Sequence, residues 1–340
     1  MKIAVLTGGG DAPGLNAVIR GIVKNAQNNG LEIVGVRRGW AGLINLDSLP
    51  LKYEDVWDII GKGGTMLGSS RTNPVKMPDG VKKVSENLKK IADGLIAIGG
   101  EDTLGVANAM YKVGVKVVGV PKTIDNDLSN TDVTIGFDTA VNTTVEAIDR
   151  IRTTGESHDR VMVVEVMGRH AGWIALHSGL ASGAELILLP EEKFDLDGIC
   201  KYIASWKEKD KRSGIVVVAE GAEMKEGSYM ISGAKADAFG HVRLGGIGQF
   251  LADQIEKRTG METRYVVLGH LARGGTPSAF DRYFGTRLGL AAVELVKQAK
   301  WGHMLSLQGT ELVAIPLELG VSKLKTVPPE TIQTVKAFEK

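Results

Sequence analysis

The chain has 340 residues, of which 43% are hydrophobic and 24% charged, and this composition is typical of a globular protein. Its formal net charge of +1 offers no general attraction to nucleic acid or to an anionic membrane, so we expect neither as a partner. The one cysteine, Cys200, excludes an internal disulfide framework, and no stretch reaches the ~20 apolar residues of a membrane helix. We therefore predict a cytoplasmic protein.

Eight short runs rich in Val and Ile are predicted as strands: residues 2–7, 32–37, 94–100, 116–121, 160–168, 184–190, 214–221 and 263–270. Amphipathic stretches of helical length lie between several of them, at residues 15–30, 80–94, 103–114 and 139–155. Strands with almost no polar residues are typical of a parallel sheet that is buried on both faces. The predicted class is α/β, with two domains or one large one at this length.

The alternation of predicted strands and helices is interrupted at two places. A boundary is predicted near residues 136–139, before a long helix, and the polar, Gly-rich segment 223–246 is predicted to be an insertion. Three units share the order strand, glycine loop, helix, with the loops GGGDAPG, GGEDTLG and MGRHAG. Ligands of open α/β sheets bind beyond the carboxyl ends of the strands, where these loops lie.

The first loop contains Gly8, Gly9 and Gly10 and precedes a helix. Glycines allow close approach of the backbone, and amide N–H groups at a helix start favour an anion, so we predict an anion site. A tight strand–helix turn is the structural alternative. Downstream, Arg71 follows the small residues of GGTMLGSSRT and is either a phosphate ligand or an ordinary surface arginine.

Two later loops carry acids. Glu101 and Asp102 follow a strand and two glycines; they suit Mg²⁺ with substrate phosphates, and the alternative is capping of the helix predicted to begin at Thr103. In PKTIDND, Lys122 and Thr123 precede Asp125 and Asp127. In an extended loop the two aspartates project to the same side. One could then abstract a proton while the other adjusts the pKa of the first or binds a metal. The alternative is an Asx-rich turn.

Further charged residues follow the later strands, namely Arg169 and His170, Glu220, and Arg264, His270 and Arg273. Each alone is more simply explained as structural. Several cations, several acids and several glycine loops together predict phosphoryl transfer to a phosphorylated hydroxyl compound.

The motifs GGGDAPGLNAVIRG, LGSSRT, IGGEDT, PKTIDNDL, VEVMGRHAGW, AEG and LGHLARGG resemble the 6-phosphofructokinases in order and spacing, over roughly residues 1–320. The resemblance implies two Rossmann-like three-layer domains with parallel-rich sheets. Residues 1–136 plus 272–322 would bind the phosphoryl donor. Residues 137–271 plus 323–340, with the insertion 223–246, would bind the sugar phosphate. It also implies a homodimer or homotetramer.

The resemblance also implies residue roles. Asp125 matches the base that takes the proton from the 1-hydroxyl of fructose 6-phosphate, and Thr123 and Asp127 flank the transferred group. Gly9, Arg71 and Thr103 match donor contacts. The sugar-phosphate pocket would contain Met167, Gly168, Arg169, Glu220, His270 and Arg273. Arg160 and Arg264 match arginines that reach a neighbouring subunit's site.

The donor is predicted from two departures. ATP-using members commonly have GGDGS and PGTIDND, whereas this chain has GGEDT and PKTIDND. Glu101 would hold Mg²⁺, with Asp102, and Lys122 would bind a terminal phosphate. A carboxylate at Asp102 opposes a nucleotide that continues past its β-phosphate, by roughly 4 kcal/mol for charges ~4 Å apart at an effective dielectric of ~20.

Asp102 and Lys122 together therefore resemble the pyrophosphate-dependent branch of the family. The predicted reaction is Mg²⁺-dependent and reversible, from pyrophosphate and fructose 6-phosphate to fructose 1,6-bisphosphate. The alternatives are the ATP-dependent enzyme and an inactive sugar-phosphate sensor. Arg20, Arg152, Lys209 and Lys211 match or adjoin effector-binding positions of ATP-using relatives, and regulation is left open.

Overall fold

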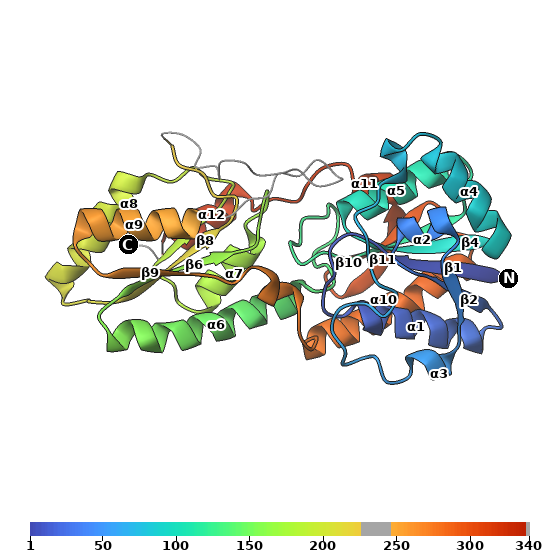
Figure 1. The fold of residues 1–340 in the computed structure, drawn as a ribbon, viewed down its shortest axis with the longest axis horizontal. Coiled ribbons are helices and arrows are strands. Elements are labelled where there is room, and N and C mark those ends of the chain that lie inside the picture. Colours follow the sequence, from blue (N-terminus) through green and yellow to red (C-terminus); the bar gives the residue numbers. More distant parts are fainter. Residues whose placement is uncertain (226–245, 338–340) are drawn as a thin grey trace. The chain divides into compact units, whose positions relative to one another are not determined.

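The computed structural model describes residues 1–225 and 246–337, so most of the predicted insertion 223–246 lies outside the described residues. The described chain forms two compact units (Figure 1). The first contains residues 1–139 and 273–325, and the second contains residues 140–225, 246–272 and 326–337. The chain thus passes between the units more than once. The predicted changes of domain, after residues 136, 271 and 322, lie within a few residues of these positions.

The first unit is built on a seven-stranded sheet in the order β11-β10-β5-β4-β1-β2-β3. Its strands are β1 (Lys2–Thr7), β2 (Glu32–Val36), β3 (Ser48–Leu51), β4 (Gly94–Gly99), β5 (Val117–Pro121), β10 (His303–Gln308) and β11 (Glu311–Pro316). The five central strands are parallel, and β3 and β11 pair antiparallel at the two edges. The predicted parallel-rich sheet is confirmed. The sequence analysis did not predict β3, β10 and β11; β3 and β10 are interrupted by Pro50 and Ser306, whereas β11 has a short apolar run that was missed.

Helices cover both faces of this sheet (Figure 1). They are α1 (Leu15–Asn28), α2 (Trp40–Asn45), α3 (Tyr53–Val56), α4 (Gly80–Ile91), α5 (Glu101–Lys112), α10 (Ala279–Lys297) and α11 (Leu317–Gly320). Helices α1 and α10 pack on one face, and α2, α4, α5 and α11 pack on the other.

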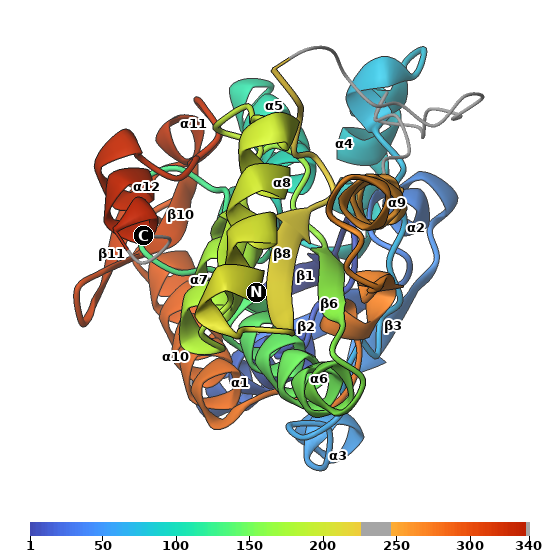
Figure 2. The same ribbon diagram turned by 90° about the vertical axis from the view of Figure 1, so that its left-hand side faces the viewer.

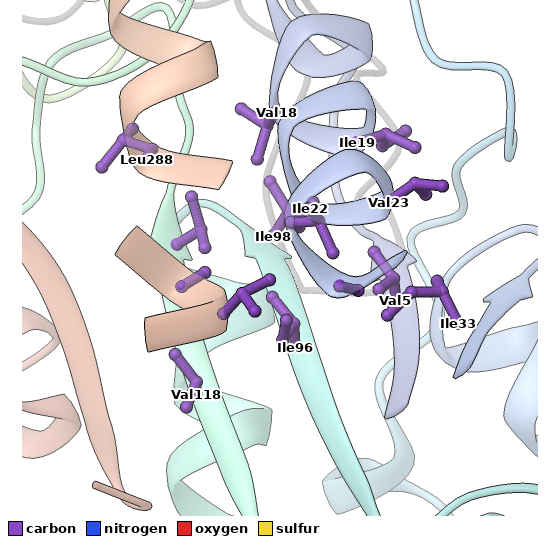
Figure 3. Close-up of a cluster of buried hydrophobic side chains, with 14 of the residues drawn as sticks. Val5, Val18, Ile19, Ile22, Val23, Ile33, Ile96, Ile98, Val118 and Leu288 are labelled. Carbon is purple, nitrogen blue, oxygen red and sulfur yellow. The ribbon is translucent and has the colours of Figure 1, made fainter. Parts of the chain in front are cut away.

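The face beneath α1 illustrates how this core forms. Val18, Ile19, Ile22 and Val23 of α1 belong to one buried cluster with valines and isoleucines of the strands; Figure 3 shows Ile22 beside Ile98, Val23 beside Val5 and Ile33, and Val18 on the side of Leu288 of α10. Positions spaced by three and four residues lie on one side of a helix, so the sequence of α1 alone produces this apolar stripe. Burying it against β1, β2 and β4 fixes α1 over the sheet.

The second unit has a four-stranded parallel sheet in the order β7-β8-β6-β9. Its strands are β6 (Val161–Val166), β7 (Leu186–Leu188), β8 (Gly214–Ala219) and β9 (Thr263–Val267). Its helices are α6 (Phe137–Ser157), which begins in the first unit, α7 (Trp173–Ala181), α8 (Leu196–Ser205), α9 (Ile247–Thr259) and α12 (Pro329–Lys336). Helices α8 and α9 pack together on one face of the sheet (Figure 2), and α6 and α7 lie on the other face (Figure 1).

One strand of the second unit departs from expectation. The run 263–270 was expected to be buried on both faces, yet Tyr265 and Val267 of β9 are 42% and 49% exposed. That expectation is wrong for β9, because β9 is at the edge of the sheet. Among the described helices, none is both long and apolar enough to cross a membrane.

Candidate functional site

The glycine loop, residues 8–10, follows β1 and lies beside the ends of β4 and β5. Gly9 has φ of +77°, a backbone conformation that favours glycine. The N–H of Gly8 donates to the carbonyl of Ile98 at 2.9 Å, and the N–H of Gly9 donates to the carbonyl of Ser70 at 3.2 Å. We expected these amides to bind an anion; in this structure the amides of Gly8 and Gly9 both have carbonyl partners. Other groups must supply the donors.

One such group is the hydroxyl of Thr103. Thr103 is 1% exposed, and its Oγ1 has no hydrogen-bond partner among the described residues. A Cβ placed at Gly8 would come within 2.6 Å of this Oγ1, and a Cβ at Gly9 within 3.6 Å. A buried polar group without a partner is costly unless a ligand or water reaches it, so the hydroxyl of Thr103 is a candidate donor to a ligand beside the glycine loop.

The other donor is the ammonium of Lys122, which is 2% exposed. Its Nζ donates to the carbonyl of Gly8 at 3.1 Å and also to that of Gly10. Burial and, to a smaller extent, the positive charge of Arg273 lower the pKa of Lys122 to about 7, although Asp11, Asp125 and Asp127 act in the opposite direction. The amine thus changes charge near neutral pH, and a bound anion would favour its charged form.

Glu101 and Asp102 occupy the first turn of α5, which begins two residues before the predicted start at Thr103. Gly100 is the N-cap, so neither acid caps the helix from that position. Acids in a first turn are stabilised by the helix dipole by about 0.3–1 kcal/mol, which is a structural reason for the pair besides metal binding.

The loop after β5 contains the predicted catalytic carboxylates. Asp125 donates its N–H to the hydroxyl of Thr123 at 3.1 Å, and that hydroxyl hydrogen bonds to Asp127. Asn126, between the two aspartates, has φ of +52°. The predicted extended loop is therefore wrong, and the chain turns at this point; the Asx-rich turn was the better interpretation.

The charge of Asp125 nevertheless acts on Asp127. Burial, followed by the charges of Asp125 and Glu101, raises the pKa of Asp127 to about 7. Hydrogen bonds, including that from Thr123, act in the opposite direction. Carboxylates that repel one another in this way favour a bound cation or a shared proton.

These carboxylates fit Mg²⁺. The repulsion of Glu101, Asp125 and Asp127 is what a divalent cation would relieve, and hard oxygen ligands suit Mg²⁺. Among the described residues there is no group of three His, Cys, Asp or Glu arranged to hold a metal by themselves. Such a site would need phosphate or water oxygens in addition, as Mg²⁺ sites commonly have.

Two predicted arginines belong to segments that contact the glycine loop or its neighbours. Arg273 donates from Nη1 to the carbonyl of Asp11 at 3.2 Å, and a Cβ at Gly10 would come within 2.5 Å of this same Nη1. It was predicted as a sugar-phosphate ligand, and it lies against the glycine loop. Arg71 is exposed and follows Ser69 and Ser70. The hydroxyl of Ser69 donates to the carbonyl of Gly9, and the carbonyl of Ser70 accepts the N–H of Gly9. The hydroxyl of Ser70 donates to the carbonyl of Arg38.

The second unit gathers the remaining predicted sugar-phosphate residues at the carboxyl ends of β6, β8 and β9. Gly168 accepts the N–H of Gly221 at 3.1 Å, which places Met167–Arg169 next to Glu220. His270 lies just beyond β9, the other neighbour of β6. These strands are adjacent and parallel, so their following loops share one edge of the sheet.

Arg160 and Arg264 lie at the other end of the same sheet. Arg160 precedes β6, and Arg264 is opposite Met162 in the β6–β9 pair. Both arginines bind Glu262: its Oε1 is 2.7 Å from Nη2 of Arg160 and 2.5 Å from Nη2 of Arg264. Six strand residues, roughly 20 Å, separate this end from Gly168. One chain's sheet does not bring both groups to one pocket.

The basic residues at or near effector positions have partners of their own. Arg152 and Lys211 both contact Oε1 of Glu185, at 3.8 Å and 2.6 Å. Arg20 donates to the hydroxyl of Tyr53 at 2.9 Å and to a main-chain carbonyl. Lys209 is exposed.

The sequence did not predict three residues of this site: Asp11, Asn126 and Lys325. Asp11 could have been predicted, because it is part of the glycine motif GGGDAPG. The ammonium of Lys325 contacts the carbonyl of Thr131 from 194 residues away, and no local pattern predicts such a contact.

A model of the phosphofructokinase family matches residues 2–296. The chain belongs to this family. It is 54% identical to the pyrophosphate–fructose 6-phosphate 1-phosphotransferase of Streptomyces coelicolor, over 99% of each chain. It is 49% identical to the ATP-dependent 6-phosphofructokinase 3 of the same organism, over 96% of this chain and 97% of that one.

The fold agrees with this family. A phosphofructokinase structure from Pichia pastoris superposes with a TM-score of 0.84 and 30% sequence identity, over 99% of this chain. The chain spans 36% of that longer protein. The predicted phosphofructokinase fold, with parallel-rich α/β sheets, is therefore confirmed.

Proposed function

We propose that this phosphofructokinase transfers a phosphoryl group from pyrophosphate to the 1-hydroxyl of fructose 6-phosphate, reversibly. The observation that carries the choice of donor is the position of Lys122, whose buried ammonium lies on the carbonyls of the glycine loop beside the hydroxyl of Thr103. These two donors are compact and suit a terminal phosphate. The higher identity to a pyrophosphate-dependent relative than to an ATP-dependent one supports the same choice.

The proposed step uses the loop after β5. Asp125 accepts the proton of the 1-hydroxyl as the hydroxyl oxygen bonds to phosphorus, and the bridging P–O bond breaks to release phosphate. The hydroxyl of Thr123 accepts the N–H of Asp125 and so orients it. Lys122 and Thr103 hold the donor, which can approach at Gly9 because this residue has no side chain. Arg71 stabilises the charge on the group in transfer.

Mg²⁺ is proposed to bind Glu101, with Asp102, since the charge of Glu101 acts on the carboxylates of the loop after β5. When bound, it would neutralise charge on the donor's phosphate oxygens. Asp102 has a second proposed role, which is to repel a nucleotide that continues beyond its second phosphate.

The sugar phosphate is proposed to bind Met167, Gly168, Arg169, Glu220, His270 and Arg273. Arg160 and Arg264, at the other end of the second sheet, are proposed to complete the pocket of a neighbouring subunit in a homodimer or homotetramer. The separation of the two groups along β6 supports this assembly. The single cysteine, Cys200, is buried and fits the cytoplasm as the proposed location.

The ATP-dependent reaction is the second candidate, because relatives with about half of their residues identical use each donor. Steady-state assays with each donor at saturating fructose 6-phosphate and Mg²⁺ distinguish the two. We expect kcat/KM to be at least tenfold higher with pyrophosphate, as roughly 1.4 kcal/mol of donor discrimination would produce. Equal or higher kcat/KM with ATP would overturn the proposed donor.

The variant Asp102→Gly tests the selector separately. We expect it to raise kcat/KM for ATP, because removing the carboxylate removes its repulsion of the nucleotide. Asp93→Gly, on the same unit but before β4, is the control and should not change donor use. Unchanged ATP use in the Asp102 variant would contradict the role given to this side chain.

A further inference from the structure

Lys325 is a half-buried residue of the site that the proposed reaction leaves without a role. It is the last residue of the first unit before the chain passes to the second. Its backbone N–H donates to the carbonyl of Asp127 at 2.8 Å. Its Nζ donates to the carbonyls of Thr131 at 2.8 Å and Asp132 at 2.9 Å. One residue therefore holds both ends of the loop 127–132.

Asn126 reaches the same carbonyl from within the loop. Its Nδ2 donates to the carbonyl of Asp132 at 3.3 Å, and its Oδ1 accepts the N–H of Thr134 at 3.1 Å. Asn126 is 4% exposed and stands between Asp125 and Asp127. The contacts of its side chain therefore decide how the turn is held, and with it the directions of the two carboxylates.

The segment around Lys325 runs beside this loop over several residues. Leu324 forms a β-bridge with Leu128, and the hydroxyl of Ser129 donates to the carbonyl of Lys323 at 2.5 Å. Within this contact the ammonium of Lys325 contributes the charge-assisted hydrogen bonds, which are stronger than neutral ones. Burial lowers the pKa of Lys325 to about 8, while Asp132 and Asp127 raise it, so the amine is largely charged at neutral pH.

We propose that Lys325 is a positioning residue for phosphoryl transfer, which acts through the carbonyl of Asp132 and through Asn126 to hold Asp125 and Asp127 in place. The proposal rests on the role of Asp125 given above. Lys325 acts on the chemical step and not on the binding of either substrate. Rate depends steeply on placement, since a misplacement of about 1 Å costs roughly a hundredfold.

The test compares Lys325→Met, which keeps the length of the side chain, with Lys325→Arg, which keeps the charge. We expect Lys325→Met to lower kcat by roughly 10- to 100-fold with little change in KM for fructose 6-phosphate or pyrophosphate. Lys325→Arg should recover most of this loss. Lys323→Met is the matched control, because Lys323 is exposed on the same segment, and it should behave as the wild type.

Calorimetric binding of fructose 6-phosphate separates positioning from a simple loss of folded enzyme. We expect Lys325→Met to keep the wild-type binding stoichiometry while its kcat falls. A kcat that falls only in proportion to the number of binding sites, or that stays at the wild-type value, would overturn the proposal.

Asp125→Asn, measured in parallel, separates this proposal from the proposed function. If Asp125→Asn is inactive and Lys325→Met is fully active, the role of Lys325 alone is wrong. If Asp125→Asn turns over at the wild-type rate, the base assignment is wrong and the role of Lys325 fails with it.

Discussion

At the scale of single residues, the site is dominated by two buried groups whose protonation changes near neutral pH. Lys122 and Asp127 are both brought to a pKa of about 7, from opposite directions, and burial is the main cause in each case. Burial disfavours the charged form of either group, and substrate or metal of opposite charge favours it. These shifts lead to two predictions about pH.

The first concerns Lys122 and the donor. Lys122 is protonated below a pH of about 7, so kcat/KM for pyrophosphate should fall as the pH rises above 7. Lys122→Gln keeps a donor toward the glycine loop but does not titrate, so its kcat/KM should be lower and lack this decline. Lys116→Gln, exposed before β5, is the control. A profile measured from pH 6 to 9 that is identical in wild type and Lys122→Gln would contradict the assignment.

The second concerns Asp127 and stability. Its folded pKa, about 7, is above the ordinary value of 3.8. A raised carboxyl pKa means that folding is favoured by protonation, so this contribution is full below pH 3.8 and is lost as the pH rises to about 7. Asp127→Asn cannot ionise and should raise Tm by a few degrees at pH 8 but not at pH 4, while kcat falls. A lower Tm at pH 8 would show that the charge does not destabilise the fold.

At the scale of elements, the start of α6 depends on one buried carboxylate. Asp281 of α10 is fully buried and accepts the N–H groups of Gly136 and Thr139 at 2.9 Å each, together with the hydroxyl of Thr139. Burial raises its pKa, although these hydrogen bonds act in the opposite direction. Asp281 thereby connects α10 to the start of α6, which directly follows the segment after the catalytic loop.

Removing this tie should destabilise the protein. Asp281→Ala leaves three buried donors without an acceptor, and we expect it to lower the free energy of unfolding by about 3 kcal/mol. Asp253→Asn, exposed on α9, should leave it unchanged. Urea unfolding at pH 7 measures both, and an unchanged midpoint for Asp281→Ala would contradict the proposed tie.

Helices and strands with a clear hydrophobic pattern were predicted well, and those without one were predicted poorly. The buried central strands appeared as unbroken apolar runs, and α1 appeared through its stripe. Strand β10, whose apolar residues are interrupted by Ser306, and β11, whose apolar run is short, were missed; they form a pair at the edge beside β5. The start of α5 was misplaced by two residues, since Glu101 and Asp102 serve a helix start and a site equally well.

At the scale of the whole molecule, the second sheet predicts that one chain is not a complete enzyme. Arg160 and Arg264 share Glu262 at one end of this sheet, and Gly168 and Glu220 lie at the other. Arg264→Ala and Asp125→Asn should each be inactive alone. Mixed under conditions of subunit exchange, they should regain measurable activity, because some pockets then combine intact residues from two chains.

The control for this experiment is a mixture of Arg264→Ala with Arg160→Ala. These two substitutions fall in the same proposed contribution to a neighbour, and we expect much less recovery from their mixture. Equal recovery from both mixtures, or none from the first, would contradict the shared site.

The sequence by itself determined the α/β class, the family and the loops that carry the chemistry, because apolar periodicity and short motifs are local properties of the chain. Glu101 and Asp125 could be named in this way. Only the tertiary structure decided that the amides of Gly8 and Gly9 are occupied, that Lys122 is buried against their loop, and that Lys325 holds the catalytic turn. Burial and contacts between distant segments set these features, and neither is written in the residues next to them.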